Sequence, residues 1–405
     1  MLVLALALGL AAGLDTLQLR PHERILIVAP HPDDEVVACG GLIQNALALG
    51  DSAWVVYVTA GDGSWPPAWR VTGNMLAGPA DYLELGRARR REAIAGAKTL
   101  GLDSAQLTFL GYPDADLARL WQQCWRSPCR SSHTDATADP YSKAGREYTG
   151  ASLLGDLMSV LKACRPDIVF APHALDAHAD HWSTAMLMAI AREVWQQPEA
   201  EQFPLVYCYL VHRPPYPEAQ TDASGLLSPP PDLSGAAHHW FALSLNQEQV
   251  RTKRQALNCH DSQQGTFGSD LHGYVGQNEL FDRVEPGGGE VAEDAPPTGF
   301  VPAARLRRVQ AAVRGDSLDL DVSLRAEPAS SFRYTFFAHS VGFEADTARH
   351  SDLALELGPI RADDSGWTVR LPWAGHSEHG VMLYSVEVRW GKTLINHSGI
   401  GRVIY

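Results

Sequence analysis

The sequence predicts a Rossmann-like α/β domain with a mostly parallel sheet, followed by a β-sandwich-like domain. The first observation is that continuous apolar runs alternate with helical patterns from residue 24 to about 212, which is typical of parallel strands covered by helices on both faces. The second is that the hydrophobic period changes to two after residue 300. We therefore expect an α/β domain over 22–285, a linker over 286–299 and a small β-rich domain over 300–405.

The expected strands of the α/β domain are short apolar runs bounded by polar residues. They cover Arg24–Ala29, Ala53–Thr59, Gln106–Leu110, Ile168–Ala171 and Leu205–Val211. Apolar residues at helical spacing indicate helices near 35–49, 84–100, 150–164, 181–196 and 246–259. Residues 121–149 form a long polar insertion, and residues 214–236 are a loop rich in Pro, Ser and Gly. In such a sheet the ligand site lies beyond the carboxyl ends of the strands.

The β-rich domain is predicted from short alternating segments separated by Gly, Pro and Asp. Ser317–Val322 alternates cleanly, and further strands are expected at Phe332–Phe337, Trp367–Leu371, Val381–Val388 and Arg402–Tyr405. Short strands of this kind suggest a small β-sandwich. A packing or spacer role is the simple interpretation of this domain, and carbohydrate binding is the alternative.

Composition and charge narrow the class of partner. The chain has 405 residues, of which 45% are hydrophobic and 20% charged, so it is long enough for two domains with a sizeable core. Its formal net charge is −14, and an acidic surface argues against nucleic acid or an anionic membrane as the main partner. We therefore look for a small-molecule site.

The N-terminal segment, residues 1–20, contains the apolar run Leu2–Ala12. This run is too short to cross a membrane as a helix, but it has the length of a signal-peptide core, although no positive charge precedes it. We expect export to the periplasm or the exterior, with a buried N-terminal helix of a cytoplasmic protein as the alternative. No other stretch is long and apolar enough for a stable membrane span.

The cysteines also bear on whether the protein is exported. Cys124 and Cys129 lie close together in a polar loop, and an exported protein could pair them in a disulfide. The other four cysteines mostly sit in apolar segments and are expected to be buried thiols.

A first polar cluster, His31-Pro32-Asp33-Asp34-Glu35, directly follows the apolar run that ends at Ala29. The exit from a strand into a helix points His31 and Asp34 into one cleft, and imidazole with carboxylate suits zinc or ferrous iron. Asp33 would lie alongside and could take a proton from a bound water. The alternative interpretation is an acidic helix N-terminus with an incidental histidine.

A second cluster, His178-Ala179-Asp180-His181, follows the predicted strand at 168–171. His178 and His181 are one helical turn apart, so one can bind a metal while the other faces substrate. Asp180 could orient an imidazole from behind. The alternative is a polar loop in a chain with 16 histidines. Together, His31, Asp34 and His181 provide three ligands and leave a position for water, as catalytic zinc requires.

Three further sets of aromatic residues have open interpretations. His212 follows the fifth strand and reaches the same rim of the sheet, so it is a candidate substrate contact against a solvated loop. Trp65 and Trp69 could stack on a sugar ring or cover the core. His238 and His239 are expected in a surface loop.

Several segments, taken in order along the chain, resemble the PIG-L/LmbE family of zinc-dependent N-acetylglucosaminyl deacetylases. The resemblance covers about residues 22–285, which implies an LmbE-like fold there, and it does not extend to the β-rich tail. The segments that carry it are Ala29–Glu35, Val58–Gly63, Arg89–Glu92, Leu110–Asp114, Asp176–His181, Ser262–Gln263 and Glu279–Phe281.

The resemblance implies a role for each matching residue. It makes His31, Asp34 and His181 the zinc ligands and Asp33 the general base. It implies that His178, assisted by Asp180, stabilises the oxyanion or donates a proton.

The resemblance also implies substrate contacts, and the sequence departs from the family pattern at three positions. It makes Arg89 and Asp62 candidate substrate contacts. Ala60 stands where the family has Asn, which puts a contact at the cleft wall in doubt, and Ala179 replaces a common Pro. Asp176 stands where some relatives have a tyrosine acid, so that acid is excluded here.

These residues predict a hydrolase that removes the acetyl group from an N-acetylated amino sugar. Zn²⁺ is the expected cofactor, and Fe²⁺ is compatible with the same ligands. The substrate would be a small molecule or a glycoconjugate of the N-acetylglucosamine type. Another metal-dependent hydrolase on the same scaffold, such as a thiol-conjugate amidase or a phosphoesterase, is one alternative. A non-catalytic sugar-binding protein is the other.

Overall fold

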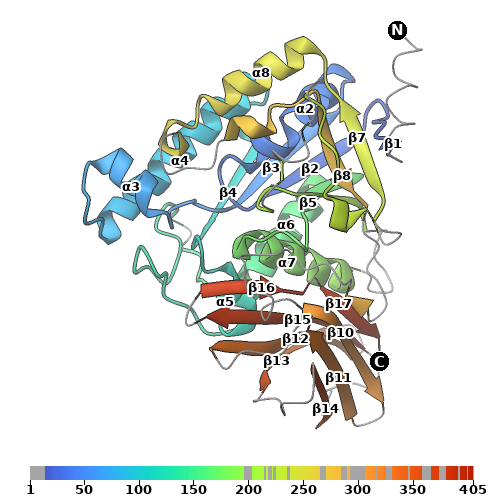
Figure 1. Cartoon of the computed structure of the whole chain (residues 1–405). Helices are drawn as coiled ribbons and strands as arrows, with labels where there is room; N and C mark the ends of the chain where they lie inside the picture. Colours follow the sequence, from blue (N-terminus) through green and yellow to red (C-terminus); the bar gives the residue numbers. More distant parts are fainter. Residues whose placement is uncertain are drawn as a thin grey trace. The chain divides into compact units, whose positions relative to one another are not determined.

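The computed structural model divides the chain into two compact units (Figure 1). Unit 1 comprises Met1–Leu117, Arg126–His173 and Pro204–Val284, and unit 2 comprises Ala118–Trp125, Ala174–Phe203 and Glu285–Tyr405. The residues that the structure describes are 14–143, 145–195, 203–213, 216–217, 221, 225–234, 238–264, 271–283, 290–291, 306–314, 317–324, 331–344, 347–357, 366–373, 380–390, 393–398 and 400–404.

Unit 1 contains an eight-stranded sheet with the order β1-β7-β8-β6-β5-β2-β3-β4. Strands β2 to β6 pair in parallel, and β8 is antiparallel to both β6 and β7. The predicted α/β class with a mostly parallel sheet is therefore confirmed. The strand bounds are β1 Asp15–Thr16, β2 Arg24–Ala29, β3 Ser52–Thr59, β4 Leu107–Tyr112, β5 Ile168–Pro172, β6 Leu205–Tyr209, β7 Trp240–Ser244 and β8 Asn278–Asp282.

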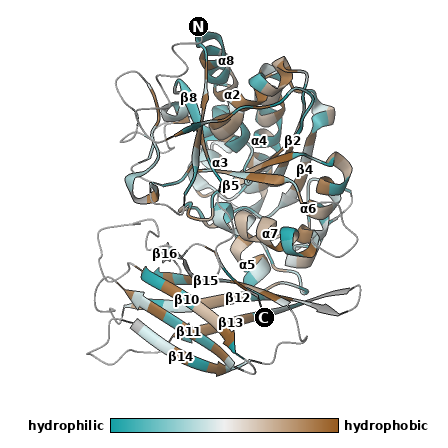
Figure 2. Ribbon diagram, turned by 90° about the vertical axis from the view of Figure 1, so that its right-hand side faces the viewer, coloured by the Kyte–Doolittle hydropathy of each residue, from teal (hydrophilic) through white to brown (hydrophobic). Residues whose placement is uncertain are grey.

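The central strands β2 and β5 show why this sheet forms. Five consecutive residues of β2, Ile25 to Ala29, are buried, as are all five of β5. Because successive side chains of a strand point to opposite faces, both faces of the sheet must be covered. Figure 2 shows β2 as largely hydrophobic. Helix α2 packs against β2, β3 and β8, and α6 packs against β2.

The helices of unit 1 match the predicted positions within a few residues, apart from α3, which was not predicted, and α4. They are α2 Asp34–Ala48, α3 Trp65–Thr72, α4 Pro79–Thr99, α6 Gly150–Cys164 and α8 Gln247–Leu257. Thr149 caps α6 by accepting a hydrogen bond from the Ser152 N–H, and Asn246 caps α8 in the same manner. Helix α4 begins five residues before its predicted start, because Pro79 occupies its first turn and Asp81 bonds back to the Gly78 N–H.

The part of unit 2 that the structure describes contains two antiparallel sheets and two helices. One sheet has the order β14-β11-β10-β9, and the other has the order β13-β12-β15-β16 with β17 also paired to β15. The helices are α5 Leu117–Gln122 and α7 Ala179–Trp195, and the strands are β9 Glu290–Val291, β10 Leu306–Arg314, β11 Ser317–Leu324, β12 Phe332–Glu344, β13 Thr347–Leu357, β14 Gly366–Pro372, β15 Gly380–Trp390, β16 Thr393–His397 and β17 Gly401–Ile404.

The two sheets of unit 2 share one hydrophobic core. Leu318, Leu320 and Val322 of β11 are buried in the same cluster as Phe336 of β12 and Val386 of β15. Along β11 buried and half-buried residues alternate strictly, as the period of two predicted. The expected β-sandwich-like character of the C-terminal region follows from this shared core.

Helix α7 packs on the second of these sheets, against β12 and β15. Arg402 of β17 holds Glu193 of α7 with two ion-pair contacts of 2.7 and 2.9 Å. The ring of Trp182 stacks on His397 of β16 with centroids 5.0 Å apart. The β-rich region therefore supports the helix whose first turn carries His181.

Several expectations fall outside the described residues or stay predictions. The apolar run Leu2–Ala12 is not described, so export stays a prediction. Of the linker at 286–299, only 290–291 are described, and the predicted domain bounds stay predictions. None of the described helices has the length and hydrophobicity needed to cross a bilayer. Cys124 and Cys129 are both disulfide-bonded, whereas the other four cysteines are free thiols.

Candidate metal centre

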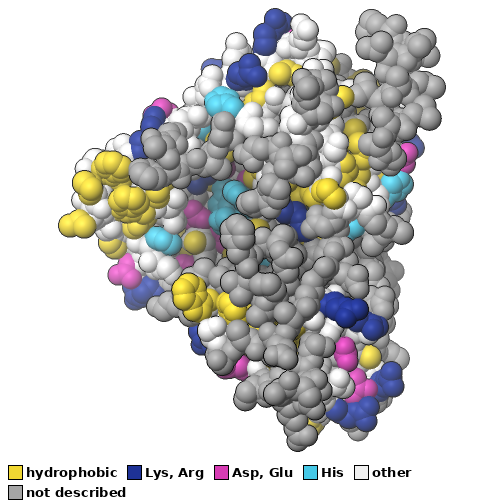
Figure 3. All heavy atoms as spheres, in the orientation of Figure 1, with side chains coloured by type: hydrophobic (Ala, Val, Ile, Leu, Met, Phe, Trp, Pro, Cys, Tyr) yellow, Lys and Arg dark blue, Asp and Glu magenta, His cyan; other side chains and the backbone are white. Residues whose placement is uncertain are grey.

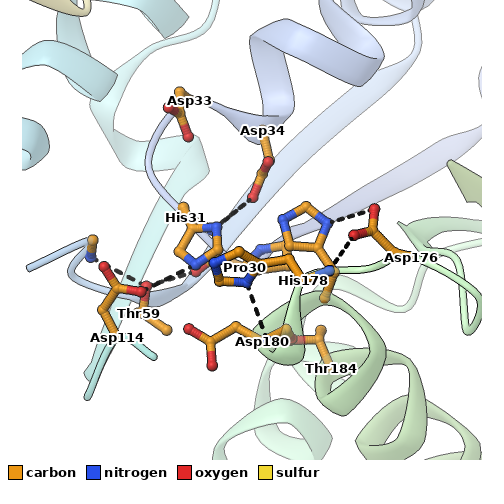
Figure 4. Close-up of polar contacts among 12 residues, drawn as sticks. Pro30, His31, Asp33, Asp34, Thr59, Asp114, Asp176, His178, Asp180 and Thr184 are labelled. Carbon is orange, nitrogen blue, oxygen red and sulfur yellow. Dashed lines mark hydrogen bonds and ion pairs between the residues drawn. The ribbon is translucent and has the colours of Figure 1, made fainter. Parts of the chain in front are cut away.

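The first cluster lies at the carboxyl end of β2, where the chain turns into α2 (Figure 4). The backbone N–H of His31 donates to Asp34 Oδ2 at 2.8 Å, which fixes the turn. The ring of His31 is buried between two carboxylates, with Nδ1 3.3 Å from Asp34 Oδ2 and Nε2 3.2 Å from Asp114 Oδ1. Asp114 thus holds the proton-bearing Nε2 and leaves Nδ1 on the side of Asp34, where it could bind a metal.

Asp33 occupies the N-cap position of α2, yet its side chain makes no capping hydrogen bond. Its Oδ1 instead lies 2.9 Å from Nη2 of Arg89, which projects from α4. The Arg89 guanidinium also donates to the Gly61 carbonyl at 3.1 Å and is buried. The structure therefore places Arg89 on Asp33, and its predicted contact with substrate stays a prediction.

Asp62 and Asp114 are buried next to each other, and Asp114 contacts the His31 ring. Asp62 accepts a 2.5 Å hydrogen bond from the Tyr141 hydroxyl and a longer one from the Asp114 N–H. Burial first, and the charge of Asp114 second, raise the pKa of Asp62 to about 7. Asp62 is only 1% exposed, and its predicted contact with substrate stays a prediction.

Glu35, the third carboxylate of the first cluster, faces the interior. It is fully buried, and neither of its carboxylate oxygens has a hydrogen-bond partner among the described residues. Burial therefore raises the pKa of Glu35 well above its usual value.

The second cluster follows β5 and opens α7. The N–H of His178 donates to Asp176 Oδ1 at 2.9 Å, and the Asp180 N–H donates to His178 Nδ1 at 3.2 Å. The second bond makes Nδ1 an acceptor, so a neutral His178 carries its proton on Nε2. Asp176 Oδ2 lies 3.2 Å from Nδ1 of the buried His181, which leaves Nε2 of that ring as the donor for a metal.

Ligand atoms from three of the predicted residues come together within unit 1. One ligand atom each of His31, Asp34 and His212 lies within 4.8 Å of the other two, and unit 2 carries His178, Asp180 and His181. Two or three imidazoles with one carboxylate form a donor set that suits zinc. These residues fit the expected cation, whereas Asp33 is held by Arg89.

Sequence reasoning missed the supporting roles of Asp114 and Asp176 and the position of His212 within ligand distance. Asp114 and Asp176 each lie in a segment that carries the family resemblance, which was the available signal. His212 was predicted to contact substrate, and its place three residues after Tyr209, the last residue of β6, gave no indication of a ligand role. Its ring lies 6.4 Å from that of His31, edge-on.

Trp65 and Trp69 of α3 stack on each other, with ring centroids 5.9 Å apart. Trp65 is 40% exposed, and its indole N–H donates to the Met75 carbonyl. Met75 and Leu76 are exposed as well, and Figure 3 shows hydrophobic side chains gathered over this part of the molecule. Stacking on a sugar ring stays a prediction for this pair.

Two comparisons with known sequences bear on the chain. Residues 26–191 match the family described as PIG-L, GlcNAc-PI de-N-acetylase, so the resemblance seen in the sequence is confirmed. Two 1D-myo-inositol 2-acetamido-2-deoxy-alpha-D-glucopyranoside deacetylases, from Mycobacterium sp. strains KMS and JLS, are each 29% identical over 182 residues. The match covers 44% of this chain and 53% of each relative, so the chain spans about half the length of the curated relatives it matches.

Solved structures give a weaker likeness. An N,N'-diacetylchitobiose deacetylase from Pyrococcus horikoshii is 20% identical with a TM-score of 0.38, over 60% of this chain and 71% of that one. A conserved protein from Thermus thermophilus is 22% identical with a TM-score of 0.39, over 69% and 98%. The 4-carboxy-2-hydroxymuconate hydratase from Pseudomonas putida is 22% identical with a TM-score of 0.38, over 64% and 83%.

Proposed function

We propose that this chain, which carries a PIG-L match over residues 26–191, is a zinc-dependent hydrolase that removes the acetyl group from an N-acetylated amino sugar of the N-acetylglucosamine type. The observation that carries the proposal is the gathering of ligand atoms from His31 and Asp34 in unit 1, with Asp33 in the same turn, together with the buried His181 held by Asp176 in unit 2. The family description and the names of the mycobacterial relatives support an acetamido sugar as the substrate class.

The metal ligands are His31 through Nδ1, Asp34 through its carboxylate and His181 through Nε2. Zinc, when bound, polarises an amide carbonyl and lowers the pKa of water to about 7. Fe²⁺ is compatible with the same donors. His31 and His181 are each held from behind by a carboxylate, Asp114 and Asp176, which fixes the tautomer and raises the basicity of the ring.

Asp33 is the general base in this proposal. Its carboxylate accepts the proton of the attacking water, and Arg89 fixes its orientation. His178 offers an N–H at Nε2 for the oxyanion that forms on the former carbonyl, because Nδ1 is occupied by the Asp180 N–H. Protonated Asp33 or His178 then delivers a proton to the leaving amine.

The test is acetate release by the zinc-loaded protein on a panel of N-acetylglucosamine compounds. Asp33→Ala should lose on the order of 10²–10⁴ in rate while keeping its zinc, because only the base is removed. Asp135→Ala, which changes an exposed aspartate, is the matched control and should keep full activity. His181→Ala should instead lose metal.

Two outcomes would contradict the proposal. Absence of acetate release from every compound, with zinc bound, would favour another amide substrate or a binding role. Full activity of Asp33→Ala would remove the assigned base and with it the mechanism.

A further inference from the structure

A second group of metal-type ligands lies in unit 1, apart from the residues assigned above. His173 directly follows β5, Asp282 is the last residue of β8, and His238 precedes β7 by two residues. One ligand atom from each of the three lies within 4.8 Å of the other two. Strands β7, β8, β6 and β5 are neighbours in the sheet, so the cluster joins the ends of segments far apart in the sequence.

Asp282 is the centre of this cluster. Its side chain is fully buried, and Oδ2 lies 3.2 Å from Nε2 of His173 and 2.5 Å from Nδ1 of His238. Oδ1 accepts a hydrogen bond from the His239 backbone N–H at 2.8 Å. The carboxylate thus presents one oxygen to two imidazoles while its other oxygen is held by the backbone.

His238 supplies the second observation. The residue lies in a loop and is half-buried, but its side chain is only 6% exposed, so the ring is turned away from the surface. The buried Nε2 of its ring has no hydrogen-bond partner among the described residues. The two ring nitrogens point in different directions, so the atom that faces Asp282 and that His238 offers to the cluster is Nδ1.

We propose that His173, His238 and Asp282 form a second zinc site, with water as the fourth ligand. Two imidazoles and one carboxylate are ligands that zinc takes in proteins. The ion would replace the protons now shared between the rings and the carboxylate, and it would tie the end of β5 to the end of β8 and to the entry of β7. This role is separate from the proposed hydrolysis and does not depend on it.

The distances between the ligand atoms fit the replacement of the shared protons by a zinc ion. Tetrahedral zinc with bonds of about 2.1 Å places neighbouring ligand atoms roughly 3.4 Å apart. The distance from His173 Nε2 to Asp282 Oδ2, 3.2 Å, is already close to this value. His238 Nδ1, at 2.5 Å from the same oxygen, has to retreat by about 1 Å, as expected when an ion takes the place of a proton.

His239 provides a matched control beside the cluster. Its ring is 58% exposed and its Nε2 bonds to Asp15 at 2.6 Å, so its side chain faces away from Asp282. Replacing this side chain leaves the backbone N–H that holds Asp282 in place. A specific site at the cluster must therefore respond to His238 and not to its neighbour.

The experiment measures zinc bound per chain in the full-length protein after loading and desalting. We expect two ions in the wild type and in His239→Ala, and one in His238→Gln. The double variant His31→Ala/His181→Ala should keep one ion, because the cluster is untouched. Adding His238→Gln to that double variant should leave none.

Thermal unfolding gives a readout that does not depend on activity. Zinc should raise the Tm of His31→Ala/His181→Ala and leave the Tm of the triple variant unchanged, because an ion bound only to the folded state stabilises it. One ion in the wild type together with none in His31→Ala/His181→Ala would overturn the proposal. Two ions in His238→Gln would overturn it as well. Neither result bears on acetate release, so failure here is distinct from failure of the proposed function.

Discussion

Arg89 is a buried cation whose side-chain contacts described here are with Asp33 and the Gly61 carbonyl. A lysine at this position has one point charge in place of a planar fork and cannot make both contacts in the same geometry. We expect Arg89→Lys to lower kcat about 10²-fold, the cost of misplacing a catalytic group by about 1 Å, with the zinc content unchanged. Steady-state kinetics and metal analysis check this prediction, and Arg87→Lys on the exposed face of α4 is the control. Loss of zinc in Arg89→Lys would show a structural role instead.

Asp62 gives a prediction about pH. Its folded pKa is about 7, raised by burial and by Asp114 from the ordinary aspartate value of 3.8. Between these values the folded protein keeps a proton that the unfolded chain has lost, so the free energy of unfolding falls as pH rises from about 4 to about 7. Asp62→Asn cannot titrate, so the wild type should lose stability relative to it in this window by on the order of 1.4 kcal/mol per pH unit.

Urea unfolding of the metal-free wild type and of Asp62→Asn, at pH 4.5 and pH 7, measures the effect. A difference between the two proteins that is the same at both pH values would refute the assigned pKa shift.

The chemistry of individual residues was partly readable from the sequence. His31, Asp34 and His181 were predicted as one set because their clusters follow parallel strands, whose carboxyl ends meet at one edge. Asp114 could not be assigned as the partner of the His31 ring, because a contact across 83 residues follows from packing and leaves no local pattern.

At the scale of elements, a buried ion pair joins α2, α8 and β8. Lys253 Nζ lies 2.6 Å from Glu279 Oε1, and the Glu279 carboxylate also accepts the N–H groups of Gly41 and Leu42. Lys253→Met leaves this carboxylate buried without its cation and should lower the free energy of unfolding by 3–5 kcal/mol, as estimated for a broken buried pair. Denaturant unfolding measures the loss.

The double variant Lys253→Met/Glu279→Gln should recover part of that stability, because no buried charge then remains. Arg70→Met, which breaks the exposed pair with Asp261, is the control and should cost less than about 1 kcal/mol. A loss in Lys253→Met as small as in this control would mean that the buried pair contributes little.

Two elements missed from the sequence, β8 and α3, were missed for different reasons. Strand β8 is buried along its whole length, yet Asn278, Glu279 and Asp282 make three of its five residues polar. These polar residues break the apolar pattern that would predict a buried strand. The groups that pair with them in the folded chain come from distant segments, so they could not be identified from the sequence. Helix α3 was missed because two prolines follow Trp65, although proline is compatible with a first helical turn.

At the scale of the molecule, unit 2 joins the C-terminal sheets to α7 and the loop before it. His397 of β16 is buried, with Nε2 2.7 Å from the Asp176 carbonyl. Asp176 in turn holds His181, so we expect His397→Phe to weaken zinc binding by about 10- to 100-fold, the usual effect of losing an outer partner of a ligand. Competition with a chelator measures this change.

Trp390→Phe is a matched control for His397→Phe, because Trp390 lies in the same sheet and is 64% exposed. Unchanged zinc affinity in His397→Phe would mean that the sheet does not position the ligand. The spacer role considered for this domain would then be sufficient.

The two fold classes were predictable from periodicity alone, since Ile25–Ala29 is apolar throughout and Ser317–Val322 alternates. The grouping of 174–203 with the C-terminal sheets was not predictable, because it depends on side chains such as Trp182 and Glu193 meeting residues some 200 positions away.

Gly61 carries a consequence for how the sequence can diverge. Its φ is +65°, and a Cβ built there would lie 2.6 Å from the Arg89 guanidinium that holds Asp33. Any side chain at 61 would therefore push the arginine off its carboxylate. In an alignment of related chains, positions 61 and 89 should therefore covary, with glycine kept wherever arginine is kept. The two residues, 28 positions apart, would then be constrained as a pair.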